Sequence, residues 1–494
     1  MADDITHLEP KLVWKYFSNI SQIPRCSKEE EAVAEYLISV AEQFGLEHIR
    51  DSVGNVVVRK PGTPGFENAP ALALQAHMDM VCEKNSDKVH DFSKDPIEFK
   101  LDGEWLYANG TTLGADNGIG VATMLAIMED TTLQHGPLEF LITVDEETGM
   151  TGAFGLGGDL LKARMIINLD SEEEGTAYIG CAGGGDTKYD LPVNRIATSD
   201  LPDSGNYQAF KVDVSGLKGG HSGVDIHEGR ANANRCLIRT LNVGNDAISG
   251  NFLFTDLKGG SKRNAISREA NAVILVPGGE AGKKDFLAAA NGEVESLKLE
   301  FRPIDPDMSI TFTEIPMPDT VLDEASSMKV LNMLTVIPHG VFAMSLDIPE
   351  LVETSTNLAI MDLQDERLYL NMSTRSSIKS ALEWGRSIHT AIGKLAGATV
   401  SNEESYPGWK PDLESGILKI VADVHEELFG EPPEKKAIHA GLECGLIKEK
   451  FPGMDAVSIG PQIEHPHSPT ERVKVPTVER FYQYVAGVMK RVAE

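Results

Sequence analysis

Five short segments of this 494-residue chain gather histidine and acidic side chains, the nitrogen and oxygen ligands that zinc and other divalent metals accept. Such residues could hold two metal ions and leave one carboxylate free to move a proton during hydrolysis. The sequence has no His-Glu-x-x-His, Cys-x-x-Cys, Gly-x-Ser-x-Gly or phosphate-binding-loop motif. The candidates are therefore His77, Asp79, Asp116, Glu146, Glu147, Asp170 and one of two C-terminal histidines, His465 or His467.

The first two segments also have ordinary structural explanations. His77 and Asp79 could be a surface pair, or Asp79 could accept a hydrogen bond from a metal-bound His77 and fix its tautomer. Asp116 lies between glycines that permit unusual backbone geometry. It could bridge two metals, or it could cap a helix expected over residues 117–129.

The other segments leave the same choice open. Glu146 and Glu147 could be solvated acids, or one could bind metal while its neighbour acts as a general base. Asp170 ends an apolar run and can be read in both ways. His465 and His467 flank a proline in a loop that could lie at the surface or supply a ligand. Only the conjunction of all five segments favours a metal site.

Three apolar runs must position these side chains. Residues 71–76, 138–144 and 163–169 are nearly continuous apolar stretches, which is typical of strands buried on both faces of a sheet. The first run leads into His77, the second into the glutamate pair and the third into Asp170. Because functional sites in open α/β sheets lie at the carboxyl ends of strands, we expect these residues to meet at one edge.

The chain is expected to contain a discontinuous α/β catalytic domain with an inserted α+β lid domain. Residues 1–186 and 404–494 share the α/β pattern, whereas 187–403 alternate strands and amphipathic helices. The lid carries His221 in a Gly-Gly-His-Ser-Gly segment and Arg375 after a predicted strand. Either residue could simply lie at the surface.

The composition narrows the class of protein. The chain has 75 acidic and 45 basic residues, a formal net charge of −30, and such a surface repels nucleic acid and anionic membranes. No apolar run approaches the roughly 20 residues of a membrane span, and the acidic first ten residues do not read as a secretory signal. An odd number of scattered cysteines argues against a disulfide framework and for a reducing cytoplasm; these are Cys26, Cys82, Cys181, Cys236 and Cys444.

The order and spacing of the five segments resemble the di-zinc aminoacylase and carboxypeptidase clan. Within this clan the chain is similar, nearly end to end, to the aminoacyl-histidine dipeptidases, also called cytosol non-specific dipeptidases. The segments that carry the resemblance are Gln75–Asp79, Gly114–Gly118, Val144–Gly149, Asn168–Glu172 and residues 461–471.

The resemblance implies which residues would bind each of two metal ions. His77 and Asp170 would hold one zinc, Glu147 and His467 the other, and Asp116 would bridge the two. Manganese or cobalt could replace zinc in a site of this kind. Three carboxylates and two neutral imidazoles would leave the two-zinc centre with net positive charge, which polarises a scissile carbonyl.

The resemblance also implies the roles of the neighbouring residues. Asp79 would orient His77, and Glu146 would take a proton from the water that bridges the metals and pass it to the leaving amine. His467 is preferred to His465 because it directly precedes a Ser-Pro-x-Glu tail like that of the family.

The substrates implied by the resemblance are unblocked dipeptides, including Xaa-His peptides such as carnosine. His221 would stabilise the oxyanion, in some relatives across a homodimer, and Arg375 would bind the substrate carboxylate. Backbone N–H groups of residues 441–445 could also reach that carboxylate. The alternatives are an N-acyl-amino-acid deacylase on the same metal core and a non-catalytic binding protein with the same fold.

Overall fold

The three apolar runs form the parallel centre of an eight-stranded sheet in the computed structural model, which describes residues 3–494. Strand β3 (Leu72–His77) lies between β6 (Leu138–Thr143) and β7 (Met165–Asn168), and both pairings are parallel. Almost every side chain in these strands is buried. The expectation of strands covered on both faces is confirmed, with the third strand two residues shorter at its start than the apolar run.

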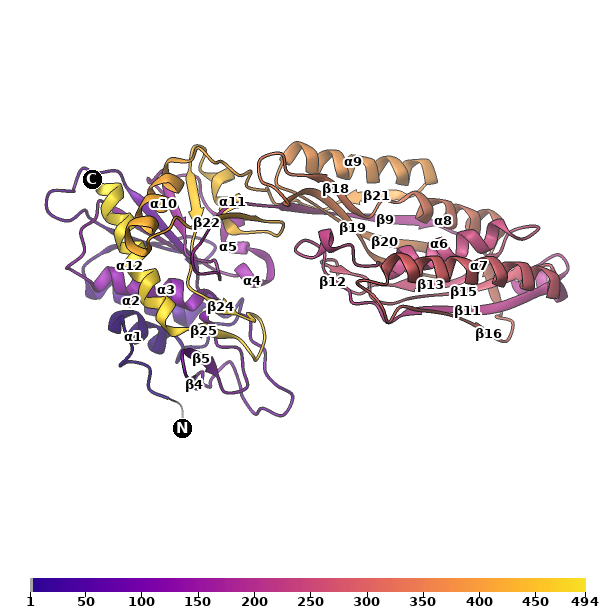
Figure 1. The fold of residues 1–494 in the computed structure, drawn as a ribbon, viewed down its shortest axis with the longest axis horizontal. Helices are drawn as coiled ribbons and strands as arrows, with labels where there is room; N and C mark the ends of the chain where they lie inside the picture. The colour runs from indigo at the N-terminus through magenta and orange to yellow at the C-terminus, as the bar shows by residue number, and fades with distance from the viewer. Residues whose placement is uncertain (1–2) are drawn as a thin grey trace. The chain divides into compact units, whose positions relative to one another are not determined.

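The remaining strands extend this sheet in the order β1-β2-β6-β3-β7-β23-β8-β22. Helices α10 and α12 pack against each other beside it (Figure 1). The strands are β1 (Glu47–Arg50), β2 (Val56–Lys60), β23 (Asp455–Ser458), β8 (Thr176–Cys181) and β22 (Glu434–Ile438). The helices are α1 (Lys11–Ile20), α2 (Glu31–Gln43), α3 (Ala115–Glu129), α4 (Glu146–Gly149), α5 (Thr151–Gly155), α10 (Gly416–Phe429), α11 (Glu443–Lys450) and α12 (Val475–Ala493).

A smaller four-stranded sheet holds the loop that contains the C-terminal histidines. Its order is β24-β25-β5-β4, and β24 pairs antiparallel with β25 so that residues 465–471 form the connection between them. The strands are β4 (Phe99–Asp102), β5 (Trp105–Ala108), β24 (Ile463–Glu464) and β25 (Arg472–Lys474).

A second, antiparallel sheet of nine strands forms a separate unit. Its order is β16-β11-β15-β13-β19-β20-β9-β21, with β18 paired to β19, and Figure 1 shows helices α6 to α9 alongside it. The strands are β9 (Gly183–Pro192), β11 (Tyr207–Ser215), β13 (Leu253–Gly259), β15 (Ala270–Pro277), β16 (Ser309–Glu314), β18 (Gly340–Met344), β19 (Val352–Leu363), β20 (Arg367–Ser376) and β21 (Thr399–Asn402). The helices are α6 (Ala233–Asp246), α7 (Gly279–Phe301), α8 (Glu324–Val336) and α9 (Lys379–Ala396).

Short elements complete this unit, and its sheet and helices share one apolar core. Strand β10 (Arg195–Ala197) pairs with β17 (Thr320–Leu322), and β12 (Gly220–His221) pairs with β14 (Ala265–Ile266). Three 3₁₀ turns are η1 (Thr198–Asp200), η2 (Ser204–Asn206) and η3 (Ile226–Glu228).

The chain thus consists of two compact units. The first comprises the residues up to Cys181, Trp409–Ala437 and Leu442–Glu494, and the second comprises Ala182–Gly408 and Ile438–Gly441. The sequence pattern predicts the division at 186/187 and 403/404. Residues 438–441 join the second unit because the N–H of Ala182 donates to two carbonyls of that segment, at 3.0 and 2.9 Å. No helix among residues 3–494 is long and apolar enough to cross a membrane.

Candidate metal centre

The carboxyl edge of the central sheet carries most of the predicted site residues. His77 is the last residue of β3, the glutamate pair opens α4 shortly after β6, and Asp170 follows β7. Asp116 comes from the loop that leads into α3, where Asp116 and Asn117 depart from helical dihedral angles and are joined by a cis peptide. The helix expected from residue 117 is therefore regular only after Asn117.

Asp116 lies between two imidazoles, one on each of its oxygens. Nε2 of His77 is 3.2 Å from Oδ1 of Asp116 and 3.3 Å from Oδ1 of Asp170. Nε2 of His467 is 3.3 Å from Oδ2 of Asp116 and 2.9 Å from Oε2 of Glu147. The five residues therefore form two three-residue donor groups that share Asp116. Both histidines of this loop are exposed, but His467 faces Asp116 and Glu147, whereas His465 belongs to no donor group among residues 3–494.

Asp79 connects His77 to the glutamate pair. Oδ1 of Asp79 is 3.2 Å from Nδ1 of His77, the ring nitrogen opposite the one that faces Asp116. The same carboxylate accepts from the N–H of Glu146 at 3.1 Å and of Glu147 at 3.2 Å, and from the Ser27 hydroxyl at 2.7 Å. Asp79 thus holds the turn that carries both glutamates and lies beside the His77 imidazole.

Glu146 is half-buried, and its carboxylate lies in one group with His77 and Glu147. Burial, together with the charge of Asp170, raises its pKa well above the ordinary glutamate value. The turn that carries Glu146 begins at Asp145, which has φ 51°. The N–H of Asp145 donates to the carboxylate of Glu30 at 3.0 Å. A carboxylate with a raised pKa is suited to accept a proton near neutral pH.

The electrostatics of the donor set fit cations. Hydrogen bonds to Asp116 and Glu147 raise the pKa of His467 to about 11, and burial raises the pKa of Asp170 to about 6. The positive charge of a protonated imidazole thus offsets the negative charge of the carboxylates, as a bound metal ion would do. Oε1 of Glu147 is buried without a hydrogen-bond partner. Two imidazoles and three carboxylates are donors that zinc, manganese and cobalt all accept.

In the second unit, His221 and Arg375 lie together. Nη2 of Arg375 is 3.4 Å from Nε2 of His221, and Nη1 donates to the Tyr406 hydroxyl at 3.0 Å. Nδ1 of His221 accepts two backbone N–H groups, which places its proton on Nε2. Burial and the nearby Arg375 lower the pKa of His221 to about 4, so the ring is neutral. The Arg375 guanidinium and the Nε2–H of His221 therefore present donors side by side, an arrangement that suits anionic oxygens.

Comparison with known proteins places the chain in a family. The model described as Peptidase family M20/M25/M40 matches residues 73–491. The chain belongs to this peptidase family. It is 42% identical over 490 residues to the cytosol non-specific dipeptidase of Escherichia coli (strain K12), a match that covers 99% of each protein. The resemblance drawn from the five motifs is confirmed.

Solved structures agree with this assignment. The aminoacylhistidine dipeptidase of Vibrio alginolyticus matches with a TM-score of 0.90 and 42% identity, covering 99% of this chain and 98% of that one. The aminopeptidase PepT of Bacillus cereus matches with a TM-score of 0.57 and 15% identity, covering 99% of this chain and 100% of that one. The second likeness shows the fold alone.

Several residues of this M20 peptidase were not among the sequence-based candidates. Arg25 and Glu471 are fully buried charged side chains beside the Asp116 loop. Glu443 accepts from Gln75 at 2.6 Å and from Thr143 at 2.7 Å. Burial raises the pKa of Glu443 to about 7. Their partners are distant in sequence, so the only signal available was the presence of Glu471 in the Ser-Pro-x-Glu tail.

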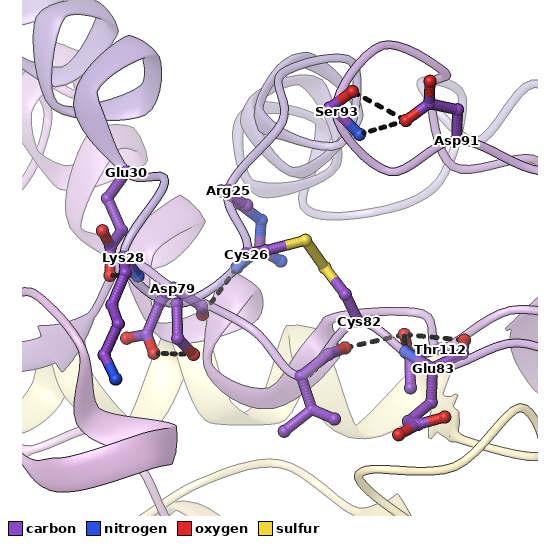
Figure 2. Close-up of a disulfide and its surroundings, with 12 residues drawn as sticks. Arg25, Cys26, Lys28, Glu30, Asp79, Cys82, Glu83, Asp91, Ser93 and Thr112 are labelled. Atoms are coloured by element: carbon purple, nitrogen blue, oxygen red, sulfur yellow. Dashed lines mark hydrogen bonds between the residues drawn. A yellow bond between two sulfur atoms is a disulfide. The ribbon is translucent and has the colours of Figure 1, made fainter.

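The cysteines also differ from expectation. Cys26 and Cys82 form a disulfide with their Cα atoms 5.7 Å apart (Figure 2), whereas the odd number of scattered cysteines argues against a disulfide framework. The two loops run side by side because the N–H of Met80 donates to the carbonyl of Arg25 at 3.1 Å. A separation of 56 residues gives no sign of this contact in the sequence. The remaining thiols are buried and belong to Cys181, Cys236 and Cys444.

Proposed function

We propose that this M20 peptidase is a metal-dependent dipeptidase that hydrolyses unblocked dipeptides, with Xaa-His peptides such as carnosine among them. The observation that carries the proposal is the position of Asp116, whose two oxygens each face an imidazole backed by a second carboxylate. The end-to-end similarity to an Escherichia coli protein named as a non-specific dipeptidase supports the substrate class. The Vibrio alginolyticus structure, named for aminoacylhistidine, supports Xaa-His peptides.

Two metals, for which we propose zinc, would polarise the scissile carbonyl and lower the pKa of the attacking water. His77 and Asp170 would hold one of them and Glu147 and His467 the other, with Asp116 shared by the two donor groups. Glu146 accepts the proton from the water and delivers it to the leaving amine. Asp79 keeps both His77 and the Glu146 backbone in place for this transfer.

The second unit supplies the proposed contacts to the substrate. Arg375 pairs with the terminal carboxylate of the dipeptide, because a guanidinium binds a carboxylate with two parallel hydrogen bonds. His221 donates its Nε2–H to the oxyanion that develops on the scissile carbonyl. A neutral ring is the form that the lowered pKa of His221 favours, and Tyr406 holds the guanidinium from its other side.

The assay that tests this function compares two histidine derivatives. We expect the zinc-loaded protein to release histidine from β-Ala-His with a kcat/KM on the order of 100-fold or more above that for N-acetyl-His, because a site built for a free amine leaves polar groups unpaired beside an acyl group. Chelator-treated protein serves as the control. A preference for N-acetyl-His would favour the deacylase, and a zinc-loaded protein inert toward both would favour a binding protein.

A homodimer is part of the proposal. Among residues 3–494, β18 and α9 of the second unit present exposed apolar side chains next to each other, and contiguous patches of this kind mark interaction sites. Trp384 is 68% and Leu346 is 96% exposed. Phe342 lies beside Gly385 of α9, next to Trp384, and Val341, Met344 and Leu346 are further exposed apolar residues of this segment. In sedimentation equilibrium we expect two chains per particle, and a dissociated species when Phe342 and Trp384 are both replaced by serine.

We also propose that the protein works in the cytoplasm, which the name of the Escherichia coli relative supports. In a reducing cytoplasm the Cys26–Cys82 pair would be present as two thiols.

A further inference from the structure

A single carboxylate organises the loop that carries Asp116. Oε2 of Glu471 accepts from the N–H groups of Leu113 at 2.7 Å and Gly114 at 2.9 Å. Its Oε1 accepts from Ala115 at 2.7 Å and from Asp116 itself at 3.2 Å. Four consecutive backbone donors therefore converge on one side chain that is only 2% exposed.

Arg25 binds the same loop through its carbonyl groups. Its Nη2 donates to the carbonyl of Gly114, and its Nη1 donates to the carbonyls of Met78 at 3.2 Å and Asp79 at 3.0 Å (Figure 2 shows the contact with Asp79). The guanidinium, also 2% exposed, thus joins the Asp116 loop to the segment that follows His77.

Gly114 is the residue at which the two charges meet. Its N–H donates to Glu471 and its carbonyl accepts from Arg25. Its φ is 69°, in the left-handed region that glycine adopts readily. A Cβ at this position would also collide with the Arg25 guanidinium and the Met80 side chain. The loop is therefore built around both buried charges.

We propose that Arg25 and Glu471 are positioning residues that hold Asp116 midway between His77 and His467 and so set the spacing of the two metals. Glu471 lies four residues after His467, in the same β24–β25 connection. These two buried side chains thus keep three ligand-bearing segments in register: the end of β3, the Asp116 loop and the C-terminal loop. The proposal rests on the metal site of the proposed function but not on the identity of the substrate.

The two acceptor oxygens of Glu471 are essential to this arrangement. A glutamine has the same shape but offers only one oxygen acceptor, and its amide adds two donors that would face backbone N–H groups. In Glu471→Gln some of the four buried donors would lose their acceptor, so the loop would shift. Arg25→Lys keeps a positive charge but replaces the planar guanidinium with a single ammonium. The ammonium cannot donate at once to the Gly114 carbonyl and to the segment that follows His77 in the same geometry.

The test measures metal binding directly. Chelator-stripped Glu471→Gln and Arg25→Lys are titrated with Zn²⁺ by calorimetry, and the Co²⁺-loaded proteins are compared by their visible absorption bands, which report ligand geometry. We expect affinity to fall by about 10–100-fold and the Co²⁺ bands to change, as is usual when a residue that orients a metal ligand is lost. We also expect kcat to fall with little change in KM.

Glu464→Gln is the matched control, because Glu464 precedes the same loop and pairs with Arg472 at 2.9 Å instead. It should keep wild-type affinity and Co²⁺ bands. Gly114→Ala is a further variant that leaves both buried side chains in place, and it should show the same metal-binding defect. It replaces either of the other variants if that variant fails to fold, as judged by circular dichroism.

Wild-type affinity and Co²⁺ bands in folded Glu471→Gln, Arg25→Lys or Gly114→Ala would overturn the positioning role, even if hydrolysis were slower. A wild-type protein that binds no metal pair would instead contradict the proposed function, so the two failures are distinct.

Discussion

Glu146→Gln is expected to lower kcat by about 10²–10⁴-fold, the usual contribution of a general acid–base group. The bound metal should stay at two ions per chain, because the amide has nearly the same shape and Glu146 is not among the proposed ligands. KM should change little, since the residue acts on the attacking water and the leaving amine. Steady-state kinetics on β-Ala-His together with elemental analysis of the purified variant measure both quantities.

The neighbouring residue provides the matched control. Glu147→Gln makes the same chemical change one position away, but Glu147 lies 2.9 Å from Nε2 of His467. We therefore expect Glu147→Gln to lose metal as well as activity. If Glu146→Gln kept wild-type kcat, or if it also lost metal, Glu146 would not be the general base.

His467→Ala is expected to remove about one metal equivalent per chain and to lower kcat/KM by about 100-fold or more, since even the loss of residues that only orient a ligand costs 10–100-fold. The imidazole of His467 faces Asp116 at 3.3 Å and Glu147 at 2.9 Å, so its removal takes one donor from one group of three. Elemental analysis after gel filtration gives the metal content.

His465→Ala tests the alternative that the sequence left open. His465 lies two residues away in the same loop but belongs to no donor group among residues 3–494, so its removal should leave both metals and the activity in place. If His465→Ala lost metal and His467→Ala kept it, His465 and not His467 would be the metal ligand.

The central sheet was the part of the fold most open to prediction. Continuous apolar runs such as 71–76 specify buried parallel strands locally, and the ligand-type residues after each run then fall at one edge. The second unit was expected only as a lid of strands and amphipathic helices, and the antiparallel pairing of its strands was not part of that expectation. The exact ends of the elements were harder to predict. The helix expected from residue 117 starts irregularly because Asp116 and Asn117 have non-helical dihedral angles.

The parts that sequence could not predict depend on contacts between distant residues. Glu471 is 355 positions from Asp116 and Arg25 is 89 from Gly114, and their partners are backbone groups that every residue carries. No periodicity marks such side chains. The Cys26–Cys82 bond and the approach of Tyr406 to Arg375 are hidden for the same reason. Buried charges of this type become visible only when the loops they hold are placed in space.

The most direct test of the two-metal site is anomalous diffraction from crystals of the zinc-loaded protein at the zinc absorption edge. We expect two peaks about 3.5–4 Å apart, the spacing of paired catalytic metals. One should lie beside His77 and Asp170 and the other beside Glu147 and His467, with Asp116 between them. A single peak, or zinc at the separate acidic group of Glu30, Asp79 and Asp145, would contradict the two-metal assignment.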